Sequence, residues 1–395
     1  MSTATATRKP QQRATTKSIT GVSGSAVQSD NAVRALRVAI VHDWLVGGGA
    51  ELVVEQLHKM YPDAPIYTSY CTDEWRKRLD NKVVTGWLQH LGKIRKFIPV
   101  LRIWWFTQLK LDEYDLVISS SGAEAKGIKT KTLHVNYCHA PTHYYWSRYD
   151  EYMKHPGFGK FDWLARIGLK LLVAPLRKWD YKAAQRPDYI IANSNHIKTE
   201  IKKYYHRDAT VIFPPVHFER FQKPQHKNLP RKGFVIAGRQ TPYKRFDLAI
   251  QACTKLNLPL RVIGSGPDHA RLRSLAGPSI EFLGRISDEA MEKEFASAEA
   301  LLFPGLDDFG ITPVEAMAAG TPVIAYKAGG ALDYVIEGKT GMFFEEQTVD
   351  SLCKALQAFQ SKTFHADTIR DSVRKFAPEY FQQNMSDYIA HLLKN

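Results

Sequence analysis

Hydrophobic residues fall in short β-rich runs that alternate with stretches of helical spacing along most of the chain. In the first half the runs are RVAIVHD, DLVISSS, TLHVNYCH, DYIIANS and ATVIFPPV, and LVVEQLHKMY has the spacing of an amphipathic helix. After the polar stretch FQKPQHKNLPRK a second series follows: GFVIAGR, PLRVIGSGP, IEFLGRI, EALLFPG, TPVIAYKAGG and GMFF. Strands that alternate with helices are typical of parallel sheets with crossover helices. The pattern therefore predicts an α/β protein with two doubly wound parallel sheets.

The same breaks in pattern predict the domain boundaries. Residues 1–36 are rich in Ser, Thr, Ala and Gln, carry mostly basic charges and show no apolar periodicity, which predicts a disordered basic tail. Residues 37–216 and 217–376 are expected to form the two Rossmann-like domains. Residues 377–395, with the sequence PEYFQQNMSDYIAHLLKN from Pro378, are expected to form a final helix.

Composition narrows the class of protein. A chain of 395 residues with 44% hydrophobic and 24% charged side chains is long enough for two or three domains with sizeable cores. Its four cysteines are far apart and form no CxxC pair, which argues against a disulfide framework or a thiolate metal site and favours a reducing compartment. Without a long apolar run or a secretory signal, we expect a cytoplasmic protein, soluble or peripheral to the membrane.

The formal charge of +14 indicates an anionic partner: nucleic acid, lipid or substrate. Within residues 92–110, the stretch GKIRKFIPVLRIWWFTQLK interleaves basic and aromatic residues with no acid, which is typical of an interfacial helix on an anionic membrane. An ordinary helix that buries its aromatics explains the stretch equally well. Nucleic-acid binding is disfavoured, because no RNP, KH, zinc-finger or helix-turn-helix pattern accompanies the charge.

Two strand ends carry groups suited to an anion, and ligands of open α/β sheets bind at the carboxyl ends of the strands. In HDWLVGGGAE, Gly48 and Gly49 allow close backbone approach at a helix N-terminus, although a tight turn is the alternative. In GRQTPYKRFD, Arg239 ends a strand and Lys244 begins a helix, a placement suited to a pyrophosphate. Solvated surface charges are the alternative there.

Two further strand ends carry groups suited to a polyhydroxyl ligand. In NYCHAPTHYYW, His139 ends a strand and either orients a substrate hydroxyl or is structural. In DDFGITPVEA, the carboxylates of Asp307 and Glu315 can accept hydrogen bonds from vicinal hydroxyls. The same stretch also predicts a capping box, with Thr312 as N-cap and Glu315 at the third helical position.

Taken in order, these motifs resemble a known family. GRQTPYK, VIGSGP, FLGRIS and FGITPVEAMAAGTPVIAYKAGGALDYVIEGKTG look like the C-terminal half of the family-4 retaining glycosyltransferases of GT-B fold, and GGGAE, HAP and ANSNHIKTEIKKYY agree with the N-terminal half. The resemblance runs from about Arg37 to the C-terminus. It implies two Rossmann-like domains that face a cleft, with the last helix crossing back to the N-terminal domain.

The resemblance also implies roles for matching residues. Arg239 and Lys244 would bind the donor diphosphate, Glu315 the ribose and Asp307 the donor sugar, at a position where the family normally has Glu. The residues implied in catalysis are His139, Arg239, Lys244 and Asp307. The residues implied in donor binding are Gly48, Gly49, Arg239, Lys244, Gly264, Arg285, Asp307, Asp308, Phe309, Gly310, Ile311 and Glu315.

The implied reaction is transfer of a hexose from a nucleotide sugar to a glycan or lipid-linked acceptor, with retention and without a divalent metal or other cofactor. DFGITPVEA together with HAPTHYYW is most similar to bacterial polysaccharide mannosyltransferases, which implies GDP-mannose as donor. The alternatives are a UDP-hexose donor, a GT-B sugar-nucleotide epimerase, or a non-catalytic membrane-binding or nucleic-acid-binding protein on this fold.

Overall fold

The structure, a computed structural model, describes residues 36–96, 99–154, 156, 159, 162–223, 225 and 229–394, with only the backbone described at 92–96. The predicted N-terminal tail, apart from residue 36, lies outside the described residues.

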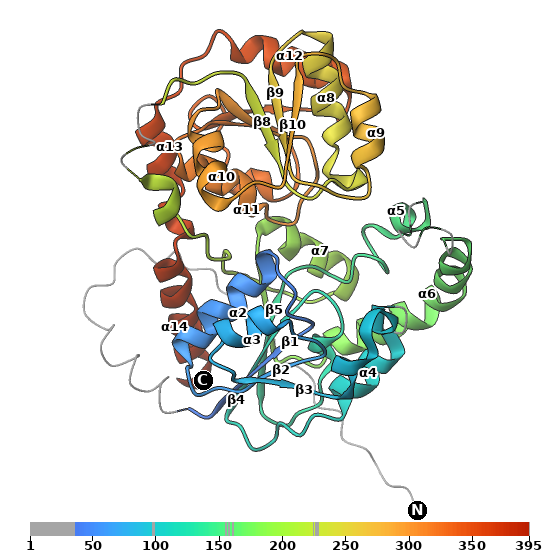
Figure 1. Ribbon diagram of the computed structural model, residues 1–395. Coiled ribbons are helices and arrows are strands. Elements are labelled where there is room, and N and C mark those ends of the chain that lie inside the picture. Colours follow the sequence, from blue (N-terminus) through green and yellow to red (C-terminus); the bar gives the residue numbers. More distant parts are fainter. Residues whose placement is uncertain are drawn as a thin grey trace, which may run out of the picture.

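Two parallel sheets, one above the other in Figure 1, form the two halves of the molecule. Among the described residues the first sheet has seven strands in the order β3-β2-β1-β4-β5-β6-β7. Their bounds are β1 Val38–His42, β2 Ile66–Thr68, β3 Val83–Thr85, β4 Leu116–Ser121, β5 Leu133–Cys138, β6 Tyr189–Ala192 and β7 Thr210–Val211. The second sheet has six strands in the order β10-β9-β8-β11-β12-β13. Their bounds are β8 Phe234–Ala237, β9 Leu260–Ile263, β10 Ile280–Gly284, β11 Ala300–Phe303, β12 Val323–Tyr326 and β13 Gly341–Phe344.

Helices connect the strands of each sheet. The helices of the first half are α2 Gly49–Met60, α3 Asp73–Arg78, η1 Trp87–Lys96, α4 Pro99–Thr107, η2 Ala125–Gly127, α5 Tyr149–Lys154, α6 Asp162–Ala184 and α7 Asn195–Tyr205. Those of the second half are η4 Glu219–Gln222, η6 Pro242–Lys244, α8 Phe246–Lys255, α9 His269–Ser274, α10 Asp288–Ala296, α11 Ile311–Ala318, η7 Gly329–Asp333, α12 Val349–Phe359, α13 Ala366–Ser372, η8 Arg374–Phe376 and α14 Pro378–Lys394. The two predicted doubly wound sheets are thereby confirmed.

The central strands form where the sequence is apolar without interruption. All five residues of β1 and all four of β8 are buried, because parallel strands covered by helices on both faces favour continuous apolar runs over alternation. Helix starts follow local chemistry: the Ser194 hydroxyl accepts a hydrogen bond of 3.0 Å from the Ile197 amide and caps α7.

The last helix belongs to the core of the first domain. Phe381, Met385 and Ile389 of α14 are buried in the same hydrophobic cluster as β1 and α2, and Gln382 donates a hydrogen bond of 2.8 Å to Gln56 of α2. Figure 1 shows α14 descending from the second domain along the side of the first. The expected crossing back of the chain is therefore present.

Two strands of the first sheet were missing from the sequence prediction. β2 and β3 have only three residues each, too few for a period-2 signal to stand out. The run ATVIFPPV gives only the two-residue strand β7, because Pro214 and Pro215 cannot continue a ladder.

No helix in the described part of the chain is long and apolar enough to cross a membrane.

Candidate active site

The strand order places the predicted loops of the second domain next to each other. β8 and β11 are hydrogen-bonded neighbours although η6, α8, β9, α9, β10 and α10 lie between them in sequence, so the order of the sheet reverses between them. Such a switch point opens a crevice at the carboxyl ends of the strands. The loop with Arg239 and Lys244 follows β8, and the loop with Asp307 follows β11. The two loops touch at Gly305, where a Cβ atom would lie 2.9 Å from the Lys244 Cα atom.

Lys244 and Asp307 form an ion pair at this crevice, and their side chains are 20% and 10% exposed. Burial disfavours the charge on Lys244, but the adjoining carboxylate overcomes burial and holds the Lys244 pKa above its usual value. Two groups beside the pair are left unsatisfied. Among the described residues, neither Asp307 Oδ1 nor the buried Tyr334 hydroxyl has a hydrogen-bond partner. A polyhydroxyl ligand would supply hydrogen-bond partners for both the Asp307 Oδ1 atom and the Tyr334 hydroxyl.

Arg239 and Arg285 are exposed cations at the ends of β8 and β10. Arg285 Nε donates a hydrogen bond of 2.9 Å to the Ser265 hydroxyl, beside Gly264. Gly264 has φ +109°, and a Cβ atom there would collide with the Gly238 carbonyl oxygen. The β8 and β9 loops therefore approach more closely than any other residue would permit.

The N-termini of two helices meet across the interface between the domains. Gly49 begins α2, Ile311 begins α11, and a Cβ atom at Gly49 would lie 2.5 Å from Ile311 Cδ1. Each helix start offers unpaired amides and a positive dipole end. The two glycine-preceded starts thus face the same space from opposite domains.

The predicted capping box is wrong. Gly310, with φ +90°, is the N-cap of α11, no side chain caps the helix, and Thr312 lies inside it. Because Gly310 adopts a left-handed conformation, the helix begins two residues earlier than it would with Thr312 as N-cap. A Cβ atom at Gly310 would also lie 2.6 Å from the Tyr334 hydroxyl, so the position excludes a side chain.

Asp308 points away from Asp307 and is held by the N-terminal domain. Its carboxylate lies 2.8 Å from His143 Nε2 and 3.5 Å from Arg148 Nη2. Burial would raise the pKa of Asp308, but His143 and Arg148 outweigh it and hold that pKa well below its usual range. Arg148 also donates a hydrogen bond of 3.2 Å to the Leu306 carbonyl and lies 4.0 Å from the Tyr243 ring centre. The Arg148 guanidinium therefore contacts both the loop that follows β8 and the loop that follows β11.

A second bridge between the domains lies beside α7. The Asn195 amide nitrogen and side chain donate hydrogen bonds of 3.0 and 2.6 Å to the Asp333 carboxylate. Lys375 Nζ donates a hydrogen bond of 3.1 Å to the Asp333 carbonyl. The sequence analysis did not identify this contact, because a local pattern carries no information about a contact between domains.

His139 is half-buried directly after β5, on the side of the N-terminal domain. Its Nε2 atom lies 2.7 Å from the Ser120 hydroxyl, and its ring is 6.1 Å from that of His42. Burial, with a smaller contribution from His42, lowers the pKa of His139 to about 3. The imidazole ring of His139 is therefore neutral at physiological pH, so it can donate and accept hydrogen bonds but carries no charge.

Glu315 faces Arg220 within the second domain. Its Oε1 atom accepts a hydrogen bond of 2.7 Å from Arg220 Nη2, and burial raises the pKa of Glu315 despite that partner. Arg220 also lies 3.0 Å from Asp288. A ribose contact at Glu315 would therefore involve a carboxylate already anchored on one oxygen.

The basic and aromatic segment, residues 92–110, is divided between core and surface. Trp105 and Phe106 of α4 are buried, and Arg102 pairs with the buried Glu124 at 2.7 Å. Of the two interpretations of this segment, the ordinary helix that buries its aromatics describes Trp105 and Phe106, since these side chains pack into the domain. Trp104 is 53% exposed. The side chains of residues 92–98 lie outside the described part of the chain.

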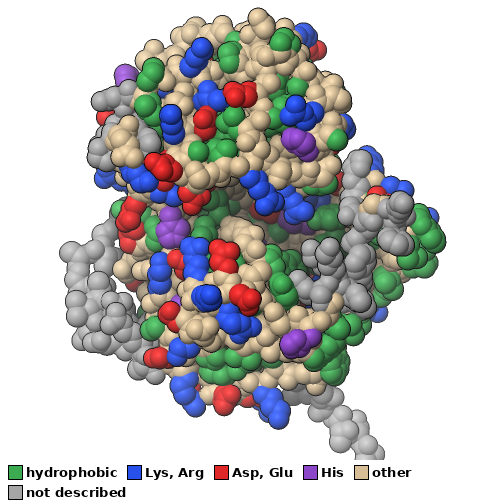
Figure 2. Space-filling model, viewed as in Figure 1, with side chains coloured by type: hydrophobic (Ala, Val, Ile, Leu, Met, Phe, Trp, Pro, Cys, Tyr) green, Lys and Arg blue, Asp and Glu red, His purple; other side chains and the backbone are tan. Residues whose placement is uncertain are grey.

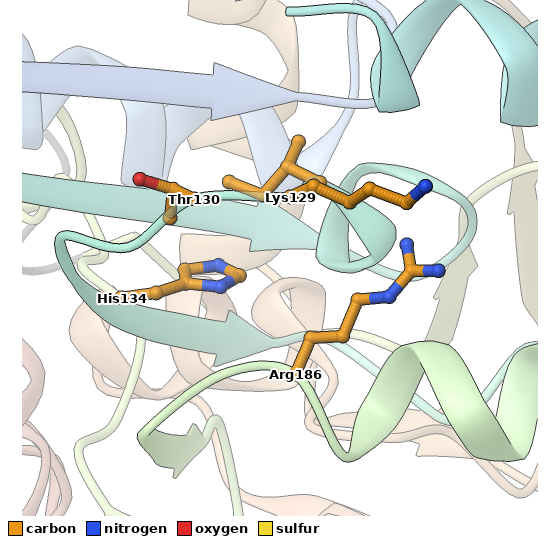
Figure 3. Close-up of a pocket in the computed structure, with 5 residues that line it drawn as sticks. Lys129, Thr130, His134 and Arg186 are labelled. Carbon is orange, nitrogen blue, oxygen red and sulfur yellow. The ribbon is translucent and has the colours of Figure 1, made fainter. Parts of the chain in front are cut away.

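The space-filling view shows a hollow between the two domains with Lys and Arg side chains at its rim (Figure 2). A separate cavity of about 210 Å³ lies elsewhere, lined by Ile128, Lys129, Thr130, His134 and Arg186 (Figure 3). These residues precede or begin β5 and β6, at the amino ends of the strands. This cavity is therefore on the edge of the sheet opposite to the candidate site.

Two family models cover most of the chain between them. "Glycosyltransferase Family 4" matches residues 47–220, and "Glycosyl transferases group 1" matches residues 217–376. The chain belongs to the family 4 glycosyltransferases of GT-B fold. This glycosyltransferase is 24% identical over 434 aligned positions to the alpha-1,3/1,6-mannosyltransferase ALG2 of Dictyostelium discoideum, covering 91% of this chain and 99% of the relative. It is 33% identical over 130 residues to a GDP-mannose-dependent alpha-mannosyltransferase of Mycolicibacterium smegmatis, covering 33% of each chain.

Other matches are partial. For four strongly matching curated relatives the aligned part spans between 57% and 15% of the relative's own length. Among solved structures, Anabaena HepE in complex with UDP has a TM-score of 0.65 to the glycosyltransferase, at 16% identity, with 90% of this chain and 100% of that chain covered. At that identity the likeness shows the fold, which agrees with the GT-B architecture expected from the sequence.

The structure brings most of the predicted site residues to one cleft. Lys244 pairs with Asp307, and Ile311, which follows Gly310, lies against Gly49 of the N-terminal domain. Four contributors were absent from the predicted donor and catalytic sets: His143, Arg148, Asn195 and Tyr334. Their places at the interface depend on packing between loops far apart in sequence, so no local pattern identified them.

Proposed function

We propose that this glycosyltransferase transfers a hexose from a nucleotide sugar to a glycan or lipid-linked acceptor, with retention of anomeric configuration. The single observation that carries the proposal is the Lys244–Asp307 pair at the β8/β11 switch point, next to the unsatisfied Asp307 Oδ1 and Tyr334 hydroxyl. A cation and two polar groups without hydrogen-bond partners, all at one strand-end crevice, suit a ligand in which a sugar is attached to a phosphate.

The donor diphosphate is assigned to the space where Gly49 and Ile311 meet. The N-termini of α2 and α11 supply amides and positive dipole ends there, and Lys244 with Arg239 supplies full charges. Fixed positive groups of this kind stabilise the charge that develops on the departing diphosphate. They would let transfer proceed without a divalent metal or other cofactor.

In the proposed reaction the bond between the sugar C1 atom and the diphosphate oxygen breaks as a bond from the acceptor oxygen to C1 forms on the same face. The acceptor hydroxyl gives its proton to the leaving phosphate oxygen. Asp307 would hold a sugar hydroxyl, and the neutral His139 would accept or donate a hydrogen bond at the N-terminal wall. Glu315 is assigned to the ribose, steadied by Arg220.

Mannose from GDP-mannose is the proposed donor sugar. Support comes from the relatives named as mannosyltransferases, one of them GDP-mannose-dependent. A UDP-hexose is the second candidate, favoured by the fold likeness to a neighbour solved with UDP. We assign the reaction to the cytoplasmic side, in polysaccharide assembly.

A donor screen tests the proposal without knowledge of the acceptor. The protein would be incubated with GDP-mannose and UDP-glucose separately, with and without chelator, and slow hydrolysis followed by mass spectrometry. We expect release of mannose from GDP-mannose at a rate that the chelator leaves unchanged. Release of an epimerised sugar would replace the proposal with an epimerase, and strict dependence on Mg²⁺ or Mn²⁺ would overturn the metal-free assignment.

A further inference from the structure

Helix α6 presents an apolar strip to solvent. Its exposed large hydrophobic residues are Trp163 (59% exposed), Leu164 (53%), Ile167 (49%), Leu171 (72%) and Leu172 (47%). Single exposed apolar residues are common on protein surfaces, but a contiguous group marks a place of contact. Five in ten consecutive residues is such a group.

The strip lies on the side of α6 that faces away from the domain. Trp163, Ile167 and Leu171 repeat at every fourth position, and at about 100° per residue they share one face with Leu164. The buried residues of α6 are Val173, Leu176, Asp180, Ala183 and Ala184. They fall on the opposite side of the helix and begin only at its middle. The first half of α6 therefore contributes nothing to the core in the described part of the chain.

The charges beside the strip are almost all positive. Arg166, Lys170, Lys178 and Lys182 are exposed on α6. Of its two acids, Asp180 is fully buried and paired with Lys126 at 2.7 Å. Trp and Leu flanked by Lys and Arg are the composition of helices that lie in the headgroup region of an anionic bilayer.

Helix α4 extends the same surface. Val100 and Trp104 are each 53% exposed, and the Trp104 ring lies 5.9 Å from that of the exposed Trp87. α4 and α6 both pack against η2 and lie on the same side of the N-terminal domain (Figure 1). Figure 2 shows hydrophobic side chains exposed along this side.

We infer that this surface, formed by the apolar strip of α6 and by Val100 and Trp104 of α4, docks the protein on a bilayer with anionic headgroups. The apolar side chains enter the boundary between headgroups and acyl chains, and the lysines and arginine contact the phosphates. The docking requires no donor and no transfer. A lipid-linked acceptor, which rests on the proposed function, would then lie on the membrane beside the N-terminal domain.

Vesicle sedimentation of the full chain tests the inference. Vesicles of equal parts phosphatidylglycerol and phosphatidylcholine are compared with vesicles of phosphatidylcholine alone. The wild type is expected to bind the anionic vesicles and to be released by high salt. The double variant Ile167→Asp with Leu171→Asp is expected to bind more than about tenfold more weakly, since two apolar insertions are replaced by charges repelled by the lipid.

The matched control is Leu393→Asp, which places the same charge at a 41% exposed leucine on α14. It is expected to bind as the wild type does, and all variants are expected to keep the wild-type melting temperature and donor hydrolysis rate. Unchanged vesicle binding by the double variant overturns the inference, because the basic tail would then carry the binding. Absence of wild-type binding overturns it too, as does a concentration-dependent dimer that only the double variant breaks, which would assign the strip to a second copy of the chain.

Discussion

Replacing Arg148 with Ala is expected to uncouple the two domains without unfolding either. The guanidinium donates a hydrogen bond to the Leu306 carbonyl, stacks on Tyr243 and lies 3.5 Å from Asp308. It is the N-terminal domain's contact with both loops that carry the predicted donor groups. Its loss leaves the His143–Asp308 pair at 2.8 Å and the Asn195–Asp333 contact, so the domains stay joined but lose the contact to both loops.

The magnitude follows from the contacts that are lost. A charge-assisted hydrogen bond and a partly desolvated cation–π contact together contribute about 2 to 5 kcal/mol. If transfer needs the arrangement in which Arg148 joins the two domains, loss of about 2 kcal/mol reduces kcat/KM by about 30-fold. The Arg148→Lys variant keeps the charge but not the planar stack, so an intermediate loss is expected.

The assay is donor hydrolysis followed by mass spectrometry, with small-angle scattering to measure the radius of gyration. Arg148→Ala is expected to lower the rate and to increase the radius of gyration. Arg37→Ala is the matched control, because it removes an exposed arginine paired with Asp115 on the far side of the domain and should change neither quantity. A rate for Arg148→Ala within about threefold of wild type would refute the coupling described here.

Three further predictions concern the site and its support. Lys126→Met should lower the free energy of unfolding by about 3 to 5 kcal/mol in chemical denaturation, because it leaves Asp180 charged and fully buried. Asp307→Glu should lower kcat/KM for the natural donor by about tenfold to a hundredfold and change the ratio between competing donors, since the longer acid displaces the sugar. Stability should fall as pH drops from 6.5 towards 3, because burial lowers the pKa of His134 and of His139 to about 3 and the unfolded chain takes up protons first. Replacing His134 with Gln should flatten that pH dependence of the melting temperature, and a slope unchanged from wild type would contradict the assignment.

Controls for the first of these are available in the same chain. Lys182→Met removes an exposed lysine on α6 and should leave stability unchanged. Equal losses for Lys126→Met and Lys182→Met would contradict the account of the buried pair.

The fold was predictable from the sequence where a buried strand gives a continuous run of apolar residues. β8 and all of β1 except its last residue, His42, are apolar because helices cover both faces of the sheet, and such runs are typical of parallel strands. β2 and β3 were missed because three residues carry too little pattern. The last helix was readable from its own periodicity, but its docking against α2 came from the family resemblance.

The site was predictable as far as local chemistry reaches. Lys244 and Asp307 could be identified from the sequence as polar residues that follow strand ends, and the strand order of the sheet brings them together. Asp308 shows the limit: one position further along, the carboxylate turns to the other domain and pairs with His143. The start of α11 shows another, because the left-handed Gly310 overrides the capping sequence that follows it. Contacts between domains and backbone handedness depend on tertiary packing, which no short window of sequence contains.

We propose that the cleft binds a nucleotide diphosphate through Lys244 beside Asp307. Titration calorimetry of GDP and GDP-mannose against the wild type, Lys244→Ala and Lys255→Ala tests it directly. Lys255 is an exposed lysine paired with Asp350 on the outer side of the same domain, so its variant should bind as the wild type does. Lys244→Ala should bind at least about tenfold more weakly, because it removes a phosphate ligand and leaves the Asp307 charge unopposed. Equal affinity of Lys244→Ala and wild type for both nucleotides would contradict the account.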